Sequence, residues 1–584
     1  MKTHYTDEKN TQIVLGLLKA HGIRKVVASP GTTNIRLVAS MQQDEWFEMY
    51  SSVDERSAAY IACGLAAQSG EPVVLSCTGA TASRNYMPGL TEAFYRKLPV
   101  LAITSTQHTG RVGQNVAQVL DRTVQPKDIV KLSVQLPTCH TEEDEWACNV
   151  HANRAMLELR RNGGGPVHIN LETTYSMNYT ITVLPEVHPI YRIEYKDEMP
   201  SLPQGRIGIF VGAHRKWTEE LTSVVDRFCE LYNAVVLCDQ TSNYRGKFRV
   251  LCNLVTYQQE YNAPCNNLDL LIHIGEVSGA YPYLKSKAEW RVHPDGEIRD
   301  TFKHLKYVFE MEELEFFKRY DRQKIENHGD SYLYSWKEAD REIRSQLKEL
   351  PFSNLWIAQH TASKLPADSI LHLGILNSLR SWNFFETPES VNVSCNTGGF
   401  GIDGIVSSAI GAALGSPEKT VFCVLGDLAF FYDMNSIGNR HVGKNLRILL
   451  INNGRGTEFR NYDHYGAQFG DDADAFIAAA GHYGAKSKDL VRHYASDLGF
   501  TYLSASSKEE YLEKLPIFLS DKDAERPIVF EAFTDSEDES NALKLLRRIK
   551  YPESSKRKDS VKGVVKSLVG ENGYNVIKKI AGKK

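Results

Sequence analysis

Two polar residues follow apolar segments that are short enough to be buried strands. Asp427 comes almost directly after the run 421–425, and Asn453 closely follows the run 446–451. Because open α/β sheets bind ligands at the carboxyl ends of their strands, we expect both side chains at one sheet edge. A carboxylate, an amide oxygen and a backbone carbonyl in the turn, at Arg455, are hard oxygen ligands that suit Mg²⁺. A set this sparse leaves room for phosphate oxygens, so a diphosphate ligand is implied.

The spacing of these residues resembles a known motif. Gly426-Asp427-Leu428, followed about twenty-five residues later by Asn452-Asn453, is similar to the diphosphate-binding motif of thiamine-diphosphate enzymes. Leucine at the third position, where glycine is usual, is typical of the menaquinone-pathway synthases that make 2-succinyl-5-enolpyruvyl-6-hydroxy-3-cyclohexene-1-carboxylate. The resemblance implies thiamine diphosphate and Mg²⁺ as cofactors, with Gly426, Asp427, Leu428 and Asn453 among the contacts. A chance Gly-Asp turn between strands is the alternative for the first motif taken alone.

A glycine-rich turn precedes this motif. Residues 395–404 read Cys-Asn-Thr-Gly-Gly-Phe-Gly-Ile-Asp-Gly and resemble the corresponding segment of the same synthases. The resemblance assigns Gly398 and Gly399 to the cofactor. It places Phe400 where a bulky apolar residue supports the bent shape of thiamine diphosphate. Ordinary packing of the turn is the other explanation for Phe400.

The N-terminal part of the chain carries a second candidate group. Glu55 opens a helix of small residues, where a carboxylate complements the helix dipole without any catalytic role. Yet Ser29-Pro30-Gly31, the segment around Glu55 and the segment 77–81 together resemble the pyrimidine-binding domain of thiamine-diphosphate enzymes. In that family a glutamate contacts N1′ of the aminopyrimidine, and Glu55 is the matching residue. Thr78 and Gly79 are then cofactor contacts.

A glutamine is the second catalytic candidate. The segment 113–118, Gly-Gln-Asn-Val-Ala-Gln, resembles the family segment that supplies an active-site glutamine. Its spacing from the glycine favours Gln118, with Gln114 as the second choice. An exposed loop glutamine without a role explains either residue equally well.

Alternating apolar strands and helices organise most of the chain. Strands are expected at 25–28, 72–77, 99–104 and 166–171 in a first set, and at 207–211, 234–237, 270–274 and 305–309 in a second. A third set runs from 370 to about 533. This alternation predicts an α/β fold with three consecutive doubly wound domains and mainly parallel sheets. The expected boundaries are 1–185 for the pyrimidine-binding domain, 186–345 for a middle domain with its linker, 346–550 for the diphosphate-binding domain and 551–584 for a basic tail.

Composition excludes several classes of protein. The 584 residues carry a net charge of −4, which is no signature for nucleic-acid binding. The ten cysteines show no paired spacing typical of disulfides or zinc. A polar N-terminus and the lack of any long apolar run predict a cytoplasmic protein. Residues 556–584 hold nine Lys and Arg against two acids; a solubilising tail is one explanation, and weak contact with an anionic membrane surface is the other.

The substrates are expected to differ from those of the menaquinone-pathway synthases. Those enzymes bind acidic substrates through arginines in three of the matching segments, where this chain has Thr33, Gln107 and Thr397. A neutral side chain cannot replace a bidentate guanidinium–carboxylate pair. The family implies a homodimer or homotetramer, with each cofactor held between two subunits.

Three functions remain open. The first is a carboligase that decarboxylates a 2-oxo acid and transfers the acyl carbanion to an acceptor. The second is a simple 2-oxo acid decarboxylase, and the third is a non-catalytic partner protein that binds the cofactor. A scaffold would not need Glu55, Asp427 and Asn453 together, which disfavours the third.

Overall fold

The computed structural model describes residues 4–280, 282–321, 331–520, 525–552 and 554–555. The chain forms two compact units, residues 1–199 with 288–311 and residues 200–287 with 312–584. The charged residues of the predicted basic tail, 556–584, lie outside the described residues. In the following, the two units are called the first and the second unit.

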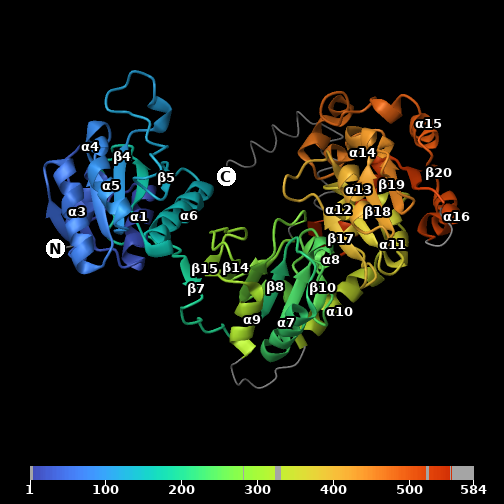
Figure 1. The fold of residues 1–584 in the computed structure, drawn as a ribbon, viewed down its shortest axis with the longest axis horizontal. Coiled ribbons are helices and arrows are strands. Elements are labelled where there is room, and N and C mark those ends of the chain that lie inside the picture. Colours follow the sequence, from blue (N-terminus) through green and yellow to red (C-terminus); the bar gives the residue numbers. More distant parts are fainter. Residues whose placement is uncertain (1–3, 281, 322–330, 521–524, 553, 556–584) are drawn as a thin grey trace. The chain divides into compact units, whose positions relative to one another are not determined.

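A six-stranded parallel sheet forms the centre of the first unit (Figure 1). Its strand order is β2-β1-β3-β4-β6-β5. The strands are β1 (Lys25–Ala28), β2 (Glu48–Ser51), β3 (Val73–Cys77), β4 (Val100–Thr106), β5 (Ser133–Leu136) and β6 (Val167–Glu172). The main helices are α1 (Lys9–Ala20), α2 (Ile35–Gln42), α3 (Glu55–Ser69), α4 (Thr81–Asn85), α5 (Met87–Tyr95) and α6 (Glu142–Glu158).

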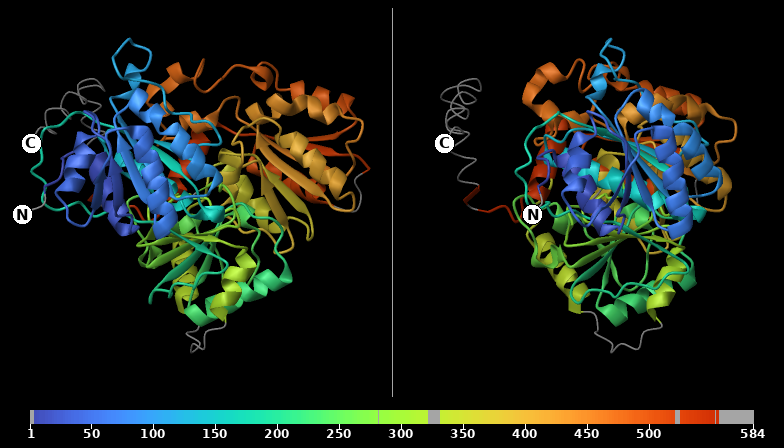
Figure 2. Two further views of the ribbon diagram at one scale, coloured as in Figure 1. Left: turned by 60° about the vertical axis from the view of Figure 1, so that its left-hand side comes forward. Right: turned by 90° about the vertical axis from the view of Figure 1, so that its left-hand side faces the viewer.

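Helices cover both faces of this sheet because successive strand residues point to opposite faces. Val26 packs into the core layer that contains Leu17 of α1. Its neighbour Val27 packs into the other layer, with Ala62 of α3. Figure 2 gives two further views of this layered arrangement. A strand buried on both faces reads as a continuous apolar run, which is why β1, β3 and β4 were predictable from the sequence.

Small residues bring α3 and α5 close together. A Cβ added to Gly89 of α5 would lie only 2.4 Å from Cβ of Ala59 in α3. Any larger residue at position 89 would therefore push the two helices apart. The alanine-rich composition of α3 is thus a packing requirement, and it holds the N-terminus of the helix, where Glu55 lies, against the sheet.

The segment 288–311 belongs to the first unit, where its strands pair with a strand from the chain after β6. The parallel order is β14-β15-β7, with β14 at Glu289–Val292, β15 at Leu305–Glu310 and β7 at Tyr191–Glu194. Arg161 lies within 3.1 Å of carboxylate oxygens of Glu158, Glu297 and Glu310. This nearly buried guanidinium therefore connects α6 to the segment 288–311.

The second unit contains two groups of parallel strands. The first has the order β10-β9-β8-β12, and the second is a six-stranded sheet with the order β17-β16-β18-β19-β21-β20. The strands of the first group are β8 (Ile207–Val211), β9 (Val235–Cys238), β10 (Arg249–Leu251) and β12 (Leu270–Ile274). Those of the second are β16 (Ile370–Leu373), β17 (Asn392–Cys395), β18 (Val421–Gly426), β19 (Leu446–Asn452), β20 (Thr501–Ala505) and β21 (Ile528–Phe533).

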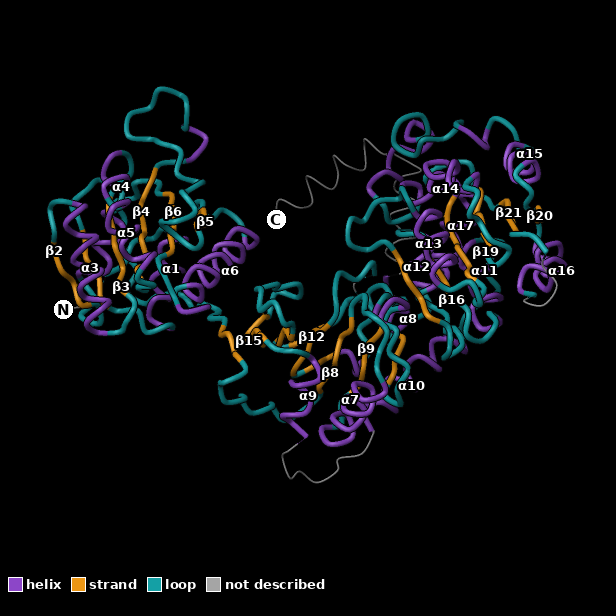
Figure 3. The backbone as a smooth tube through the Cα atoms, viewed as in Figure 1, coloured by secondary structure: helices purple, strands orange, loops and turns teal. Residues whose placement is uncertain are grey.

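Helices also cover both faces of the six-stranded sheet, as the tube in Figure 3 shows. On one face Cys423 of β18 packs with Ile410 of α13. On the other face Phe422 contacts Phe518 of α16, with ring centroids 5.5 Å apart. The helices of the second unit are α7 (Glu219–Tyr232), α8 (Asn253–Thr256), α9 (Glu313–Asp321), α10 (Ser331–Ser345), α11 (Asn354–Thr361), α12 (Asn377–Trp382), α13 (Ile405–Gly415), α14 (Asp427–Asp433), α15 (Leu490–Asp497), α16 (Lys508–Leu519) and α17 (Ser536–Arg547).

The predicted α/β class with parallel sheets is confirmed. Strands 25–28, 207–211 and 270–274 have the predicted bounds, and the others differ by one or two residues at an end. Residues 310–348, the linker expected after the middle domain, contain α9 and α10. Trp336 of α10 is fully buried. In the part of the chain that the structure describes, none of the helices is both long and apolar enough to cross a bilayer.

Replacing Arg161 should destabilise the first unit. Arg161→Met leaves Glu297 without its cation, and Glu158 and Glu310 then share Arg192, so we expect a loss of about 2–3 kcal/mol in the free energy of unfolding. Urea unfolding followed by fluorescence measures the loss. The matched control is Arg160→Met, because Arg160 is the exposed neighbour and forms no ion pair among the described residues. Equal stability of the two variants would contradict this role of Arg161.

Candidate active site

The carboxyl ends of β18 and β19 bring Asp427 and Asn453 together. The two strands pair in parallel with Gly426 opposite Ile451, so the residues that follow them lie side by side. Asp427 begins α14 and is only 5% exposed. Burial raises the pKa of this carboxyl to about 7, although the amide groups of Leu428 and Gly454 oppose the shift. The chain thus keeps a carboxyl group in a place where water solvates it poorly.

The side-chain oxygen of Asn453 is the second unusual group. Oδ1 of Asn453 is buried and accepts no hydrogen bond from the described residues. A buried acceptor without a partner is costly, on the order of 1–3 kcal/mol. A bound cation removes this cost and also favours the charged form of Asp427. The two oxygens therefore fit a hard divalent cation such as Mg²⁺.

Arg455 was predicted to contribute its backbone carbonyl. That carbonyl accepts a hydrogen bond from the amide of Thr457 at 2.9 Å. The guanidinium of Arg455 donates to both carboxylate oxygens of Asp474, at 2.9 and 2.8 Å. A carbonyl has a second lone pair, so the assignment of Arg455 to the metal stays a prediction. Among the described residues no three His, Cys, Asp or Glu side chains cluster as a metal site.

The glycine-rich turn presents Phe400 in a strained conformation. Phe400 has φ 56°, a region that costs a non-glycine residue about 1–3 kcal/mol. Its phenyl ring is 40% exposed. At Gly398 and Gly399 no atom lies within 4 Å of the place a Cβ would take, so the turn leaves open space beside its backbone. Strain combined with an exposed aromatic ring is what a ligand-supporting residue would show.

In the first unit, Glu55 is not needed to cap its helix. The side chain of Asp54 accepts hydrogen bonds from the amides of Arg56 and Ser57 and so fills the capping position. Glu55 is partly buried, and its Oε2 accepts a hydrogen bond from Asn85 at 3.3 Å. The helix-end explanation for Glu55 is therefore weakened, because a neighbouring carboxylate already performs that function.

Thr78 and Gly79 form a tight turn at the carboxyl end of β3. A Cβ at Gly79 would lie 3.2 Å from the carbonyl oxygens of Ser105 and Gln118, so the site requires glycine or a shift of its neighbours. The hydroxyls of Thr33 and Thr78 are 2.6 Å apart. Thr33 also donates to the carbonyl of Ser105 at 2.9 Å.

The glutamine prediction is not decided by the structure. Gln114 and Gln118 both lie exposed in the loop after β4. Gln118 has φ 64°, and its backbone carbonyl approaches Gly79. Gln118 remains the favoured candidate because its backbone is the one that packs on the Thr78-Gly79 turn.

At the three positions expected to carry arginine in the related synthases, this chain has two threonines and a glutamine. The Thr33 hydroxyl is engaged as described, and Gln107 accepts a hydrogen bond from Arg111. Thr397 is buried at 6% exposure.

Sequence reasoning missed Arg122, which is buried in the first unit and donates to Asn170 Oδ1 at 2.6 Å. Nothing in its loop sequence distinguishes this arginine from a surface residue.

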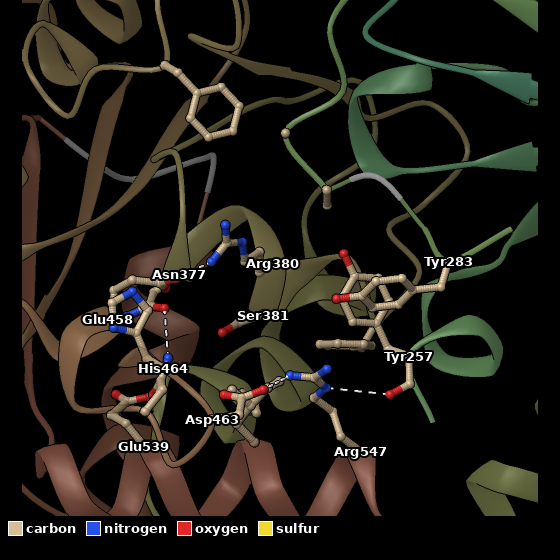
Figure 4. Close-up of a pocket in the computed structure, with 17 residues that line it drawn as sticks. Tyr257, Tyr283, Asn377, Arg380, Ser381, Glu458, Asp463, His464, Glu539 and Arg547 are labelled. Atoms are coloured by element: carbon tan, nitrogen blue, oxygen red, sulfur yellow. Dashed lines mark hydrogen bonds and ion pairs between the residues drawn. The ribbon is translucent and has the colours of Figure 1, made fainter. Parts of the chain in front are cut away.

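A pocket of about 480 Å³ opens within the second unit (Figure 4). Asn377, Arg380 and Ser381 follow β16, Phe400 follows β17, and the other polar groups follow β19 and β21. These latter groups are Glu458, Asn461, Asp463, His464, Glu539 and Arg547. Ligands of open α/β sheets bind at this edge, where the strand order reverses between β16 and β18. The sequence motifs identified only Phe400 of this set, because the remaining residues are far apart in the chain.

Comparisons with known proteins identify the family of the chain. Residues 9–124 match the family described as thiamine pyrophosphate enzyme, N-terminal TPP binding domain. Three relatives are each called 2-succinyl-5-enolpyruvyl-6-hydroxy-3-cyclohexene-1-carboxylate synthase. That of Bacteroides fragilis is 33% identical over 92% of this chain and 98% of its own length. That of Bacteroides thetaiotaomicron is 32% identical with the same coverage, and that of Flavobacterium johnsoniae is 27% identical over 91% and 97%.

Among solved structures, the thiamine diphosphate-dependent 4-hydroxybenzoylformate decarboxylase of Rhodococcus jostii RHA1 matches with a TM-score of 0.36. It is 16% identical, and the match covers 90% of this chain and 99% of that one. The matched family model and the relatives define the class of protein as a thiamine-pyrophosphate enzyme. The chain belongs to the family of these enzymes that contains the 2-succinyl-5-enolpyruvyl-6-hydroxy-3-cyclohexene-1-carboxylate synthases.

The buried Glu539 beside the pocket predicts a pH dependence of stability. Its two oxygens accept from the amide of Asn354 at 3.0 Å, yet burial raises the pKa of Glu539 to about 7. The folded state therefore binds a proton more tightly than the unfolded state. This contribution is complete below about pH 4.5 and is lost as the pH rises through about 7.

We expect Glu539→Gln to remove this part of the pH dependence, on the order of 3 kcal/mol between pH 5 and pH 8. Thermal unfolding at several pH values measures it. Glu537→Gln, an exposed carboxylate on the same helix, is the control. If Glu539→Gln lost stability with pH as steeply as the control, Glu539 would be ionised in the folded protein.

Proposed function

We propose that this protein binds thiamine diphosphate together with Mg²⁺, decarboxylates a 2-oxo acid and transfers the remaining acyl group to an acceptor. The observation that carries the proposal is the pair of buried oxygens at the ends of β18 and β19. Asp427 and Asn453 are desolvated and lack a side-chain partner among the described residues, as a cation site requires.

The roles follow from the positions in each half-site. Asp427, Asn453 and the carbonyl of Arg455 would hold Mg²⁺, which would supply positive charge for the diphosphate. The backbone at Gly426 and Leu428 would face the phosphates at the start of α14. Phe400, with the open backbone at Gly398 and Gly399 beside it, would support the bent shape of the cofactor.

The first unit would hold the pyrimidine end. Glu55 would keep a proton at N1′ of the aminopyrimidine, and Thr78 and Gly79 would contact the ring. Gln118 would lie nearest the reacting atoms. When bound, thiamine diphosphate supplies the carbanion chemistry that the side chains alone cannot provide.

Transfer to an acceptor is favoured over simple decarboxylation by the pocket in the second unit. A decarboxylase that ends in protonation needs space for one small substrate, whereas about 480 Å³ suffices for a further molecule. The substrates differ from those named for the relatives, because Thr33, Gln107 and Thr397 cannot form guanidinium–carboxylate pairs.

The test is the release of CO₂ from a panel of 2-oxo acids by protein loaded with thiamine diphosphate and Mg²⁺. Glu55→Gln should lower both CO₂ release and hydrogen–deuterium exchange at C2 of the bound cofactor by about 10²-fold or more, because an amide cannot hold the N1′ proton. Glu142→Gln replaces another acid in the first turn of a helix and should leave both rates unchanged. Wild-type exchange in Glu55→Gln would make Glu55 a structural residue.

The assembly proposed is a homodimer, or a homotetramer built from two such dimers. Glu55 and Asp427 lie in different units and are expected to hold opposite ends of one cofactor. In a two-fold dimer each site then takes Glu55 from one subunit and Asp427 from the other, and the dimer has two equivalent sites.

Mixing two inactive variants tests this arrangement. Glu55→Gln and Asp427→Ala are dissociated, combined in equal amounts and reassembled. A heterodimer collects both lesions in one site and leaves the other intact, so about a quarter of wild-type activity should return. If mass spectrometry confirms subunit exchange and no activity appears, each site is built within one chain.

A further inference from the structure

We propose that the acceptor is a neutral, polyhydroxylated carbonyl compound, such as a sugar aldehyde, and that it binds in the 480 Å³ pocket of the second unit. This inference rests on the proposed function and adds the chemical class of the second substrate. It comes from the charges, the aromatic rings and the free polar groups that line the pocket.

The charges of the pocket oppose an acidic ligand. Its two guanidinium groups are already paired, Arg380 with Glu458 and Arg547 with Asp463 (Figure 4). The third carboxyl group, Glu539, has no cationic partner among the described residues. Among the described residues that line the pocket, neither guanidinium group is therefore free to pair with an acidic ligand. A carboxylate or phosphate would have to break an ion pair or lie beside like charges, and both are costly.

Aromatic side chains form one wall. The rings of Tyr257 and Tyr283 lie with centroids 5.0 Å apart, and Phe384 packs edge-on to Tyr257 at 6.2 Å. Tyr283 is 61% exposed, so its ring is available to a ligand. Aromatic faces bury the C–H surfaces of a sugar ring or a polyol chain.

Hydroxyl groups of a ligand would find donors and acceptors opposite this wall. The Ser381 side chain points into the pocket (Figure 4). Its hydroxyl forms no hydrogen bond with the described residues. Nδ1 of His464 accepts from the amide of Gly466 at 3.0 Å, which leaves Nε2 to carry the ring proton as a donor. The outer oxygens of the paired carboxylates supply acceptors. The two guanidinium–carboxylate pairs and the aromatic rings together favour a neutral ligand with several hydroxyl groups.

The reaction with such an acceptor balances without an oxidant or reductant. The C1–C2 bond of the 2-oxo acid breaks, and C1 leaves as CO₂. A new bond joins C2 of the donor to the carbonyl carbon of the acceptor. The carbonyl oxygen of the acceptor takes one proton and becomes a hydroxyl, so the product is a 2-hydroxy ketone.

Binding and turnover are measured separately on the protein loaded with thiamine diphosphate and Mg²⁺. Saturation-transfer NMR compares neutral D-glyceraldehyde, D-erythrose and D-ribose with D-glyceraldehyde 3-phosphate and succinate semialdehyde. Mass spectrometry then identifies the products that each forms with the 2-oxo acid giving most CO₂. We expect signals and products from neutral compounds and at least tenfold weaker ones from the anionic compounds.

Tyr283→Ala should reduce binding of the neutral compounds at least fivefold, with CO₂ release from the 2-oxo acid alone unchanged within twofold. Tyr334→Ala, which removes a similarly exposed tyrosine from α10 outside the pocket, should change neither. Preferred binding of the anionic aldehydes, or neutral binding that survives Tyr283→Ala, would overturn the inference while CO₂ release still supports the proposed function. Absence of CO₂ release with every 2-oxo acid would instead refute the proposed function.

Discussion

A buried carboxyl group at the end of one strand is the constraint on which the rest of the second unit depends. Ionisation of Asp427 costs free energy, because burial raises the pKa of its carboxyl group to about 7. The parallel register of β18 and β19 places the unpartnered oxygen of Asn453 next to it. Neither group improves folding in isolation, and the proposed cation site would account for both. The apolar layers on both faces of the sheet supply the stability that offsets them.

In the first unit, too, some residues stabilise the fold and others are available for chemistry. The alanine-rich helix α3 and its close approach to Gly89 are packing features that stabilise the sheet. They also fix the place of Glu55, whose neighbour Asp54 takes over the capping function. A residue released from a structural duty in this way is available for chemistry. Arg122 is buried in the same unit, and its Nε and Nη1 have no hydrogen-bond partner among the described residues, so this arginine has no chemical assignment.

Central strands were predictable because they are apolar on both faces, as in β8 and β12. Short strands were missed where this signal is absent. β2 is half exposed, β5 alternates buried and partly buried residues, and no residue of β7 is fully buried. Such segments pair because their neighbours in the sheet offer a free edge, and this information lies elsewhere in the chain. Similarly, local motifs identified Asp427, Asn453 and Glu55, whereas the pocket of the second unit joins residues from 257 to 547. No local pattern could bring Arg547 to Asp463.

The pocket residues also bear on the three positions where the related synthases are expected to carry arginine. Thr33, Gln107 and Thr397 are neutral where the related synthases are expected to carry arginine, and within the pocket Arg380 and Arg547 are each already paired with a carboxylate. On the proposed function, the chain would keep the cofactor site of its family and join different molecules. This separation is expected where binding of the cofactor and selection of the substrate rest on different residues.

The central claim, that Asp427 and Asn453 form the metal-dependent cofactor site, is tested most directly by calorimetric titration of metal-free protein with thiamine diphosphate. With Mg²⁺ present the wild-type protein should bind the cofactor, and without Mg²⁺ the affinity should fall by at least 10²-fold. Asp427→Ala should show the weak affinity under both conditions, and Asp472→Ala, which removes an exposed carboxylate of the same unit, should behave as the wild type. Mg²⁺-dependent binding of wild-type strength by Asp427→Ala would contradict the account.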